Sequence, residues 1–134
     1  MMNCIFCKIV TGEFESYCIY EDELFKVILD KFPASAGHTL ILTKNHYENV
    51  YELGEKEAEA LGAVIVKMSK LLKSKLGCAG LNVLQNNGEA AGQVINHFHM
   101  HLIPRYDGDG IVMKWVMGKP GDDEIGEVLD RLRG

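Results

Sequence analysis

The histidines of this chain are gathered in two short segments. His97, His99 and His101 alternate with apolar residues in one run, while His38 and His46 lie at the two ends of another segment. Imidazole titrates near neutral pH, so it can act as a nucleophile, as an acid or base, or as a metal ligand. Clustered imidazoles repel one another when protonated, so a purely structural role gives little reason to gather them. The pattern therefore indicates a chemical site.

The spacing of the alternating histidines limits what one metal ion can bind. Same-face neighbours on a strand are about 6.6 Å apart, which separates His97 from His101 by about 13 Å. Zinc binds nitrogen at about 2.0–2.1 Å and sulfur at about 2.3 Å, so one ion cannot bind all three histidines of an intact strand. The run must therefore serve at least two purposes. One division combines His97 with a second histidine and with Cys4 and Cys7, and leaves His99 and His101 for a reacting group.

Cys4 and Cys7 form a C-x-x-C pair near the start of the chain. The same spacing occurs in thioredoxin-like redox sites, but those sites accompany a βαβ pattern, which is not found here. Two cysteines can also pack as small hydrophobic residues. We favour a metal site over both alternatives.

Composition narrows the class of protein. The chain has 134 residues, 47% of them hydrophobic and 25% charged, as expected of one globular domain. Nineteen acidic residues outnumber fourteen basic ones, and without a basic cluster we expect no nucleic-acid partner. Apolar runs such as LILT and AVIV are too short to cross a bilayer, and MMNCIFCKIV lacks the features of a signal peptide. We therefore expect a cytoplasmic protein with no membrane partner.

Hydrophobic patterning predicts an α+β fold. Apolar residues recur at helical spacing from Glu55 to Leu76, where Gly77 ends the helix, and they alternate with histidine in NHFHMHLIPR as in a strand. That strand would place Phe98, Met100 and Leu102 on the face opposite the histidines. The remaining expected elements are a short helix over 4–11, strands over 17–21, 24–30, 38–44 and 81–86, and a helix over 123–132. Together they predict an antiparallel sheet with the long helix on one face, and Trp115 in the tail as a packing anchor.

The run HFHMHLI resembles the H-φ-H-φ-H-φ-φ signature of the histidine-triad (HIT) superfamily, in which φ is apolar. CIFCKIV, LDKFPASAGHTLILTKNH and AAGQVINHFHMHLIPR are similar to the three blocks of this family, and they follow in the same order. The resemblance covers residues 4 to about 107 of a single domain over 1–134, with a tail over 108–134. It is closest to the Hint-like branch, in its microbial form with an N-terminal C-x-x-C. It implies a HIT-like fold whose sheet continues across a homodimer.

The resemblance also implies an activity. Members of this family hold a nucleotide in a cleft and transfer its α-phosphoryl group through a histidine. By position, His99 would be the nucleophile, with His101 and His38 contacting the phosphate oxygens. The implied function is hydrolysis of purine nucleoside phosphoramidates or related adenylates through a covalent nucleotidyl-histidine.

Further site residues follow from the same resemblance. Asp30 aligns with the residue that binds the ribose hydroxyls, and Asn86 aligns with a polar residue near the ribose and phosphate. Gly92-Gln93-Val94 resembles the phosphate loop, whose backbone N–H groups can bind oxygens without a basic side chain. The apolar walls around the base would be Ile5, Phe6, Ile9 and Ile28, which can equally be ordinary core residues.

The resemblance points to Cys4, Cys7, His46 and His97 as ligands of a structural Zn²⁺, whereas the spacing argument does not choose between His46 and His38. Four protein ligands leave no open position for water, so this zinc would not be catalytic. No organic cofactor is expected.

Two departures from the branch keep other functions open. Val94 replaces a serine that is placed to assist the leaving group, and Ile28 replaces an aromatic residue that contacts the base. A nucleotide-binding regulatory module with little catalysis is therefore an alternative. A dinucleoside polyphosphate hydrolase and a hydrolase with a catalytic zinc are two others.

Overall fold

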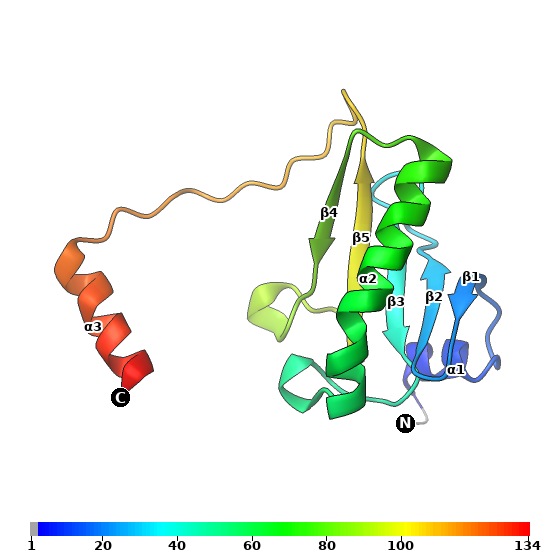
Figure 1. The fold of residues 1–134 in the computed structure, drawn as a ribbon, viewed down its shortest axis with the longest axis horizontal. Coiled ribbons are helices and arrows are strands. Elements are labelled where there is room, and N and C mark those ends of the chain that lie inside the picture. Colours follow the sequence, from blue (N-terminus) through cyan, green and yellow to red (C-terminus); the bar gives the residue numbers. More distant parts are fainter. Residues whose placement is uncertain (1–2) are drawn as a thin grey trace.

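The computed structural model describes residues 3–134 as an antiparallel five-stranded sheet with one long helix across a face, which confirms the predicted α+β class (Figure 1). The strand order is β1-β2-β3-β5-β4, and every neighbouring pair is antiparallel. The elements are α1 (Ile5–Val10), β1 (Tyr17–Glu21), β2 (Phe25–Leu29), β3 (Thr39–Thr43), η1 (Val50–Glu52), α2 (Glu55–Leu76), β4 (Gly80–Leu84), η2 (Glu89–Ala91), β5 (His99–Arg105) and α3 (Asp122–Arg133).

Helix α2 has the bounds that its apolar spacing predicts. Val64, Met68 and Leu72 are buried on the face that packs against the sheet. The helix ends at Gly77, whose φ of +63° is in the left-handed region and whose N–H donates to the Lys73 carbonyl. Glycine adopts this conformation without the penalty that a Cβ brings, so it is a suitable residue for ending the helix here.

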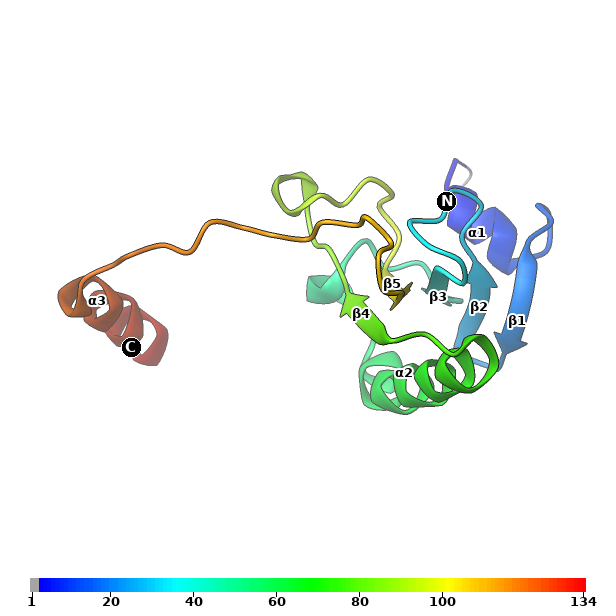
Figure 2. The same cartoon turned by 90° about the horizontal axis from the view of Figure 1, so that it is seen from above.

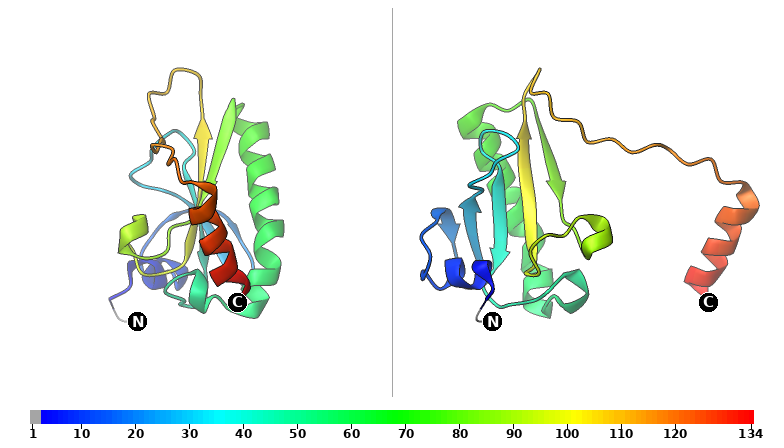
Figure 3. Two further views of the ribbon diagram at one scale, coloured as in Figure 1. Left: turned by 90° about the vertical axis from the view of Figure 1, so that its left-hand side faces the viewer. Right: turned by 180° about the vertical axis from the view of Figure 1, so that it is seen from behind.

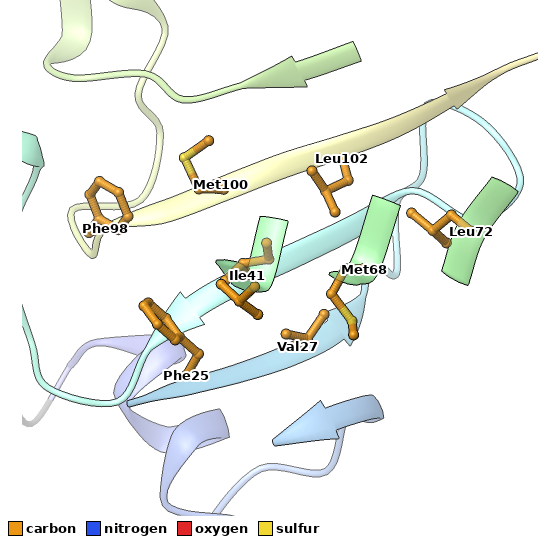
Figure 4. Packing of buried hydrophobic residues seen from close by; sticks show 9 residues of the cluster. Phe25, Val27, Ile41, Met68, Leu72, Phe98, Met100 and Leu102 are labelled. Atoms are coloured by element: carbon orange, nitrogen blue, oxygen red, sulfur yellow. The ribbon is translucent and has the colours of Figure 1, made fainter. Parts of the chain in front are cut away.

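The sheet separates two apolar clusters. Alternate residues of the central strands contact α2, and Figure 4 shows Phe25, Val27, Ile41, Met100 and Leu102 gathered against that helix. The residues between them point to the opposite face. There Ile28, Leu40 and Leu42 pack around Phe6 of α1. Full burial of each such side chain contributes about 1.5–3 kcal/mol, so α1 is anchored to the sheet by a small core of its own.

Strand β5 begins at His99, two residues later than a strand containing all three histidines requires. The Phe98 N–H donates to the Tyr47 carbonyl at 2.7 Å rather than to a neighbouring strand, so His97 lies in a bend before the sheet. His99 and His101 stand opposite Leu42 and Leu40 in β3, on the α1 face. The prediction that all three histidines belong to one strand is therefore wrong for His97, although its ring packs against Phe6 on the same α1 face.

The C-terminal segment leaves the rest of the molecule. Residues 110–121 have no regular structure, and α3 lies apart from the sheet and from α2, as Figures 1 and 2 and the right-hand view of Figure 3 show. Trp115 is 84% exposed, so the expectation that it anchors packing is wrong within this chain. Among the described residues, no helix has the length and apolar composition needed to cross a membrane.

Candidate functional site

Four potential metal ligands converge between α1, the end of β3 and the start of β5. Cys4 is the N-cap of α1 and Cys7 lies one turn later, so both thiols fall on the same side of the helix. His46 belongs to the turn after β3, and His97 to the bend before β5. The ligand atoms of these four residues all lie within 4.8 Å of one another. The fold therefore brings His46, and not His38, to the cysteines.

The distances between these ligand atoms are within about 0.2 Å of the range of those between the ligands of a tetrahedral zinc ion. His97 Nδ1 lies 3.4 Å from Cys4 Sγ, 3.5 Å from Cys7 Sγ and 3.1 Å from His46 Nδ1. Cys7 Sγ lies 3.2 Å from His46 Nδ1. Ligand atoms bound at 2.0–2.3 Å in a tetrahedron are separated by about 3.3–3.8 Å. Two thiols and two imidazoles are also the donors that a structural zinc ion prefers, so the residues fit such an ion.

The tautomer of His97 favours a bound cation, whereas Cys7 would have to lose its proton to bind one. His97 Nε2 lies 2.7 Å from the Thr43 carbonyl, which can only accept, so Nε2 carries the proton and Nδ1 offers its lone pair to the cysteines. Burial lowers the pKa of His97 to about 4, which keeps the ring neutral. Burial and the neighbouring Cys4 thiol raise the pKa of Cys7 to about 11. A bound cation would supply the positive charge that a buried thiolate lacks.

His99 is held as a lone-pair donor. Its Nδ1 lies 2.6 Å from the His97 carbonyl, so Nδ1 carries the proton and Nε2 is free of one. Phe6 packs with its ring edge-on to His99, at a centroid distance of 4.9 Å. Burial lowers the pKa of His99 despite the opposing effect of the hydrogen bond and of Asp30, so the imidazole is neutral at pH 7. A fixed and neutral imidazole is suited to nucleophilic attack.

His38 and His101 form a directed pair beside it. The Ala34 N–H donates to His38 Nδ1 at 3.0 Å, so the proton of neutral His38 is on Nε2. That atom lies 3.0 Å from His101 Nδ1, which must accept, and His101 therefore carries its own proton on Nε2. Burial, followed by the nearby His99 and His38, lowers the pKa of His101 to about 4. The pair thus presents a neutral N–H donor next to His99.

Asp30 supplies the negative charge of the site. One carboxylate oxygen accepts the Phe32 N–H at 2.9 Å, which fixes the side chain at the end of β2. The other oxygen lies 3.6 Å from His38 Nε2. The potential ligands Asp30, His38 and His101 are close enough to bind a metal, but the proton on His38 Nε2 opposes it.

These groups border a cavity of about 450 Å³ whose walls are mostly apolar. His99, His101 and Asp30 line one part of it, whereas His38 lies behind His101 and does not. The size fits a small organic ligand with a few polar groups. Predicted binding residues that line the cavity are Ile5, Phe6, Ile9, Ile28, Asp30, Asn86, Gly92 and Val94.

Gln93 is the predicted binding residue that the structure does not bring to the cavity. Its side chain is buried, accepts the Gly88 N–H at 2.7 Å, and donates to the carbonyls of Glu48 and Ile95 at 2.7 and 3.0 Å. The backbone N–H groups of Gly92 and Gln93 also bond within this loop, at the Glu89 and Gly88 carbonyls. Gln93 therefore shapes the loop.

Several cavity residues were not found from the sequence. They lie before or in β1 and after β2: Glu15, Ser16, Tyr17, Lys31 and Phe32. Tyr17 pairs with Leu29, the residue before Asp30. The predicted hairpin over 17–21 and 24–30 could therefore have placed Tyr17 near Asp30, because the register of a hairpin brings the start of one strand to the end of the other. Glu15 and Phe32 have no such local signal.

Comparisons with known proteins bear on this site. A family model described as the HIT domain matches residues 11–108. The chain is 44% identical over 131 residues to an uncharacterized HIT-like protein of Methanocaldococcus jannaschii, covering 98% of this chain and 99% of that protein. It is 34% identical over 136 residues to an adenosine 5′-monophosphoramidase of Candida albicans, covering 98% and 90%. It is 41% identical over 107 residues to an adenylylsulfatase of Arabidopsis thaliana, covering 80% and 54%.

Solved structures share the fold. A protein of Streptococcus mutans aligns with a TM-score of 0.93 and 37% identity, covering 99% of this chain and 85% of that one. A HIT family member of Bacillus subtilis aligns with a TM-score of 0.91 and 38% identity, covering 98% and 95%. A zinc-bound histidine triad protein of Mycobacterium smegmatis aligns with a TM-score of 0.78 and 34% identity, covering 97% and 92%.

Proposed function

The chain belongs to the HIT domain family, and from this premise we propose that it hydrolyses purine nucleoside phosphoramidates or related adenylates through His99. One observation carries the proposal. The His97 carbonyl holds His99 Nδ1–H at 2.6 Å, which leaves the Nε2 lone pair of a neutral imidazole at the wall of the cavity. Relatives named as a phosphoramidase and an adenylylsulfatase support this class of substrate.

In the proposed first step, the Nε2 lone pair of His99 attacks the α-phosphorus and forms an N–P bond. The bond from phosphorus to the leaving amine or acid breaks, and the leaving group takes the electron pair and, if it is an amine, a proton from the solvent. Water then attacks the same phosphorus and releases a proton to the solvent, while the N–P bond breaks and its electron pair returns to His99 Nε2, which gives a nucleoside monophosphate. His99 returns to its neutral form, so the cycle is closed.

His101 would stabilise the charge that grows on the phosphoryl oxygens. Its proton is on Nε2 because His38 donates to its Nδ1 at 3.0 Å. A donor that is already oriented costs no reorganisation when charge develops. The Ala34 N–H, His38 and His101 therefore form a fixed chain of donors, and His38 acts through His101 rather than on the substrate.

The cavity would hold the nucleoside. Asp30 can accept two vicinal ribose hydroxyls, because only one of its oxygens is engaged by the Phe32 N–H. Asn86 and the loop carrying Gly92 and Val94 lie along the same cavity, where the phosphate would bind. The apolar walls formed by Phe6 and Ile28 would contact the base.

Cys4, Cys7, His46 and His97 would hold a structural Zn²⁺. The ion would supply a cross-link that fixes α1, and with it Phe6, against the start of β5. The carbonyl of His97, a ligand, also orients His99, so the metal centre and the nucleophile share one backbone segment. The zinc-bound relative supports this assignment.

A regulatory module with little catalysis remains the second candidate, and Val94 is the observation that favours it. Val94 is 90% exposed at the cavity and offers no hydroxyl to a leaving group. Hydrolysis of dinucleoside polyphosphates is a further candidate substrate class. A cytoplasmic homodimer is part of the proposal, supported by the family resemblance.

The test is intact mass after rapid mixing with adenosine 5′-phosphoramidate, quenched at neutral pH because N–P bonds are acid-labile. We expect a transient nucleotidyl adduct and accumulating AMP with the native chain, and neither with His99→Ala. Gln85→Ala, a change in a polar side chain outside the cavity lining, serves as the control and should keep both signals. Bound nucleotide without adduct or AMP would favour the regulatory module instead.

A further inference from the structure

The loop over residues 31–37, between β2 and β3, joins two residues of the proposed site. Asp30 precedes the loop and His38 follows it. The Asp30 N–H donates to the His38 carbonyl at 2.9 Å, and the His38 N–H donates to the Ser35 carbonyl at 3.1 Å. The loop is therefore closed at its base, and its path sets how the backbone of Ala34 meets the ring of His38.

The Ala34 N–H decides where the protons of the His38–His101 pair lie. A neutral imidazole has one N–H and one lone pair, so the N–H that donates to His38 Nδ1 leaves the proton of this ring on Nε2. If Ala34 moves away, His38 can carry its proton on Nδ1 instead. His38 Nε2 then accepts from His101 Nδ1, and His101 Nε2 becomes a lone pair. One backbone contact thus determines whether His101 presents a donor to the cavity.

Asp30 favours the same tautomer of His38, but less strongly. The carboxylate oxygen that faces the ring lies 3.6 Å from His38 Nε2, which is longer than a hydrogen bond. The contact from the Ala34 N–H is 3.0 Å long. Release of Ala34 would therefore leave both tautomers of the pair populated rather than reverse the pair completely.

Two hydroxyl groups hold this loop beside the end of β5, where the right-hand view of Figure 3 shows it in cyan. The Ser35 hydroxyl donates to the Pro104 carbonyl at 2.5 Å. The Tyr106 hydroxyl donates to the Ala36 carbonyl at 2.7 Å. Pro104 is fully buried in β5, so the bond from Ser35 ends on a rigid part of the sheet.

Gly37 lets the loop approach the same strand closely. Its φ of +92° is in the left-handed region, which glycine adopts without penalty. A Cβ at this position would overlap Leu76 Cδ1 at the end of α2, and would lie 3.2 Å from Pro104 Cγ. Residues 31–34 are exposed, so the path of the loop depends on the contacts that residues 35–37 make with β5 and α2.

We propose that Ser35 and Tyr106 are positioning residues for the reaction. Their hydroxyls keep the Ala34 N–H on His38 and thereby keep the proton of His101 on Nε2. Neither Ser35 nor Tyr106 lines the cavity, so both act through the backbone of the loop. The kinetic part of this inference rests on the proposed function, whereas the placement of the protons does not. The ordinary alternative is that the two hydroxyls only add to the stability of the fold.

The test combines NMR spectra of the histidine rings with kinetics, both on the full chain. Ser35→Ala with Tyr106→Phe removes the two hydroxyls alone. Long-range proton–nitrogen correlation spectra at neutral pH distinguish a protonated ring nitrogen from one with a lone pair. We expect Nε2–H on His38 and His101 in the native chain, and signals of both rings shifted towards the Nδ1–H form in the variant. With adenosine 5′-phosphoramidate, kcat should fall about tenfold, less than the roughly 100-fold loss on deleting a charge-stabilising donor outright, and KM should change less than about twofold.

A matched control removes the same two groups from exposed positions outside the loop. Ser74→Ala with Tyr51→Phe should keep the native ring signals and the native kcat. Native ring signals in the Ser35–Tyr106 variant would overturn the proposal even if kcat falls, because a lower kcat alone reports a structural role. Shifted ring signals with an unchanged kcat would overturn it as well. If the native chain hydrolyses nothing, the proposed function fails, and the ring signals alone decide whether the hydroxyls place the protons.

Discussion

At the scale of single residues, the hydrogen bonds of the histidines decide what each ring can do. His97 and His99 each donate to a carbonyl, but from different nitrogens, Nε2 in His97 and Nδ1 in His99. The free lone pair is therefore Nδ1 on His97, facing the cysteines, and Nε2 on His99. Adjacent members of one sequence motif thus serve a metal centre and a reaction because the backbone presents them with opposite nitrogens.

The pKa of His101 gives a prediction about pH. Burial lowers this pKa to about 4, whereas Asp30 opposes the shift. Between pH 4 and 6.5 the unfolded chain would bind a proton at His101 that the folded chain does not, so this group favours unfolding as the pH falls through that range. We expect its Cε1–H resonance to titrate near pH 4 in NMR spectra, and Asp30→Asn to lower the midpoint further. A midpoint near 6.5 in the native chain would contradict the burial of this neutral ring.

Gln93 carries the second prediction at this scale. Its buried amide accepts one backbone N–H and donates to two carbonyls, so Gln93→Ala leaves buried polar groups without partners. We expect the free energy of unfolding to fall by about 1–3 kcal/mol in chemical denaturation. Val94→Ala, at the exposed neighbouring position, should change it by less than about 0.5 kcal/mol. Equal stabilities of the two variants would mean that the amide does not hold this loop.

At the scale of elements, the first turn of α2 supports the metal centre by binding the residues on either side of His46. Glu57, in its first turn, is buried and accepts from Asn45 Nδ2 at 3.0 Å and from the Tyr47 hydroxyl at 3.1 Å. These two residues flank His46, and the Tyr47 carbonyl accepts the Phe98 N–H next to His97. One carboxylate therefore holds the turn that carries His46, and the Tyr47 carbonyl of this turn binds the bend that carries His97.

We therefore expect Glu57→Ala to weaken metal binding although Glu57 is not a ligand. The variant leaves Asn45 and Tyr47 unpaired and loosens the turn that carries His46, so zinc should be lost to a competing chelator at least tenfold more readily. Glu57→Gln retains an acceptor oxygen and should restore most of the affinity, while Glu59→Ala, exposed on the same helix, should have no effect. The absorption of Co²⁺ bound to the site gives a readout independent of activity. Unchanged Co²⁺ spectra and affinity for Glu57→Ala would rule out this support.

At the scale of the whole molecule, local patterns predicted the elements but not every contact between them. The bounds of α2 and the two faces of β5 follow from apolar spacing, which depends on near neighbours along the chain. The choice of His46 over His38 follows from the turn after β3, which the sequence shows only through the family resemblance. The bend at His97 is held by the Phe98 N–H, which donates to the Tyr47 carbonyl 51 residues earlier, and the periodicity of the sequence does not predict this bond.

The C-terminal segment, residues 111–134, shows the same limit most clearly. Its composition predicts packing, and Trp115 suggests an anchor, but no local pattern says which surface receives it. The path of this segment depends on a short turn in which Asp109 accepts from Arg105 and from the N–H groups of Tyr106 and Ile111. These donors hold the pKa of Asp109 far below its usual value, so the turn keeps its charge pair across the physiological pH range.

Because this turn sets the direction in which residues 111–121 leave the sheet, we expect Asp109→Asn to make this segment more mobile while the sheet stays folded. The amide removes the charge and one acceptor oxygen from Arg105, so residues 111–121 would sample more directions. The fluorescence anisotropy of Trp115, the single tryptophan, should fall, and the circular dichroism of the sheet should be unchanged. Asp107→Asn, exposed in the same turn, removes the same charge without touching Arg105 and should keep the native anisotropy. If Asp109→Asn also keeps the native anisotropy, the turn does not set the direction of the segment.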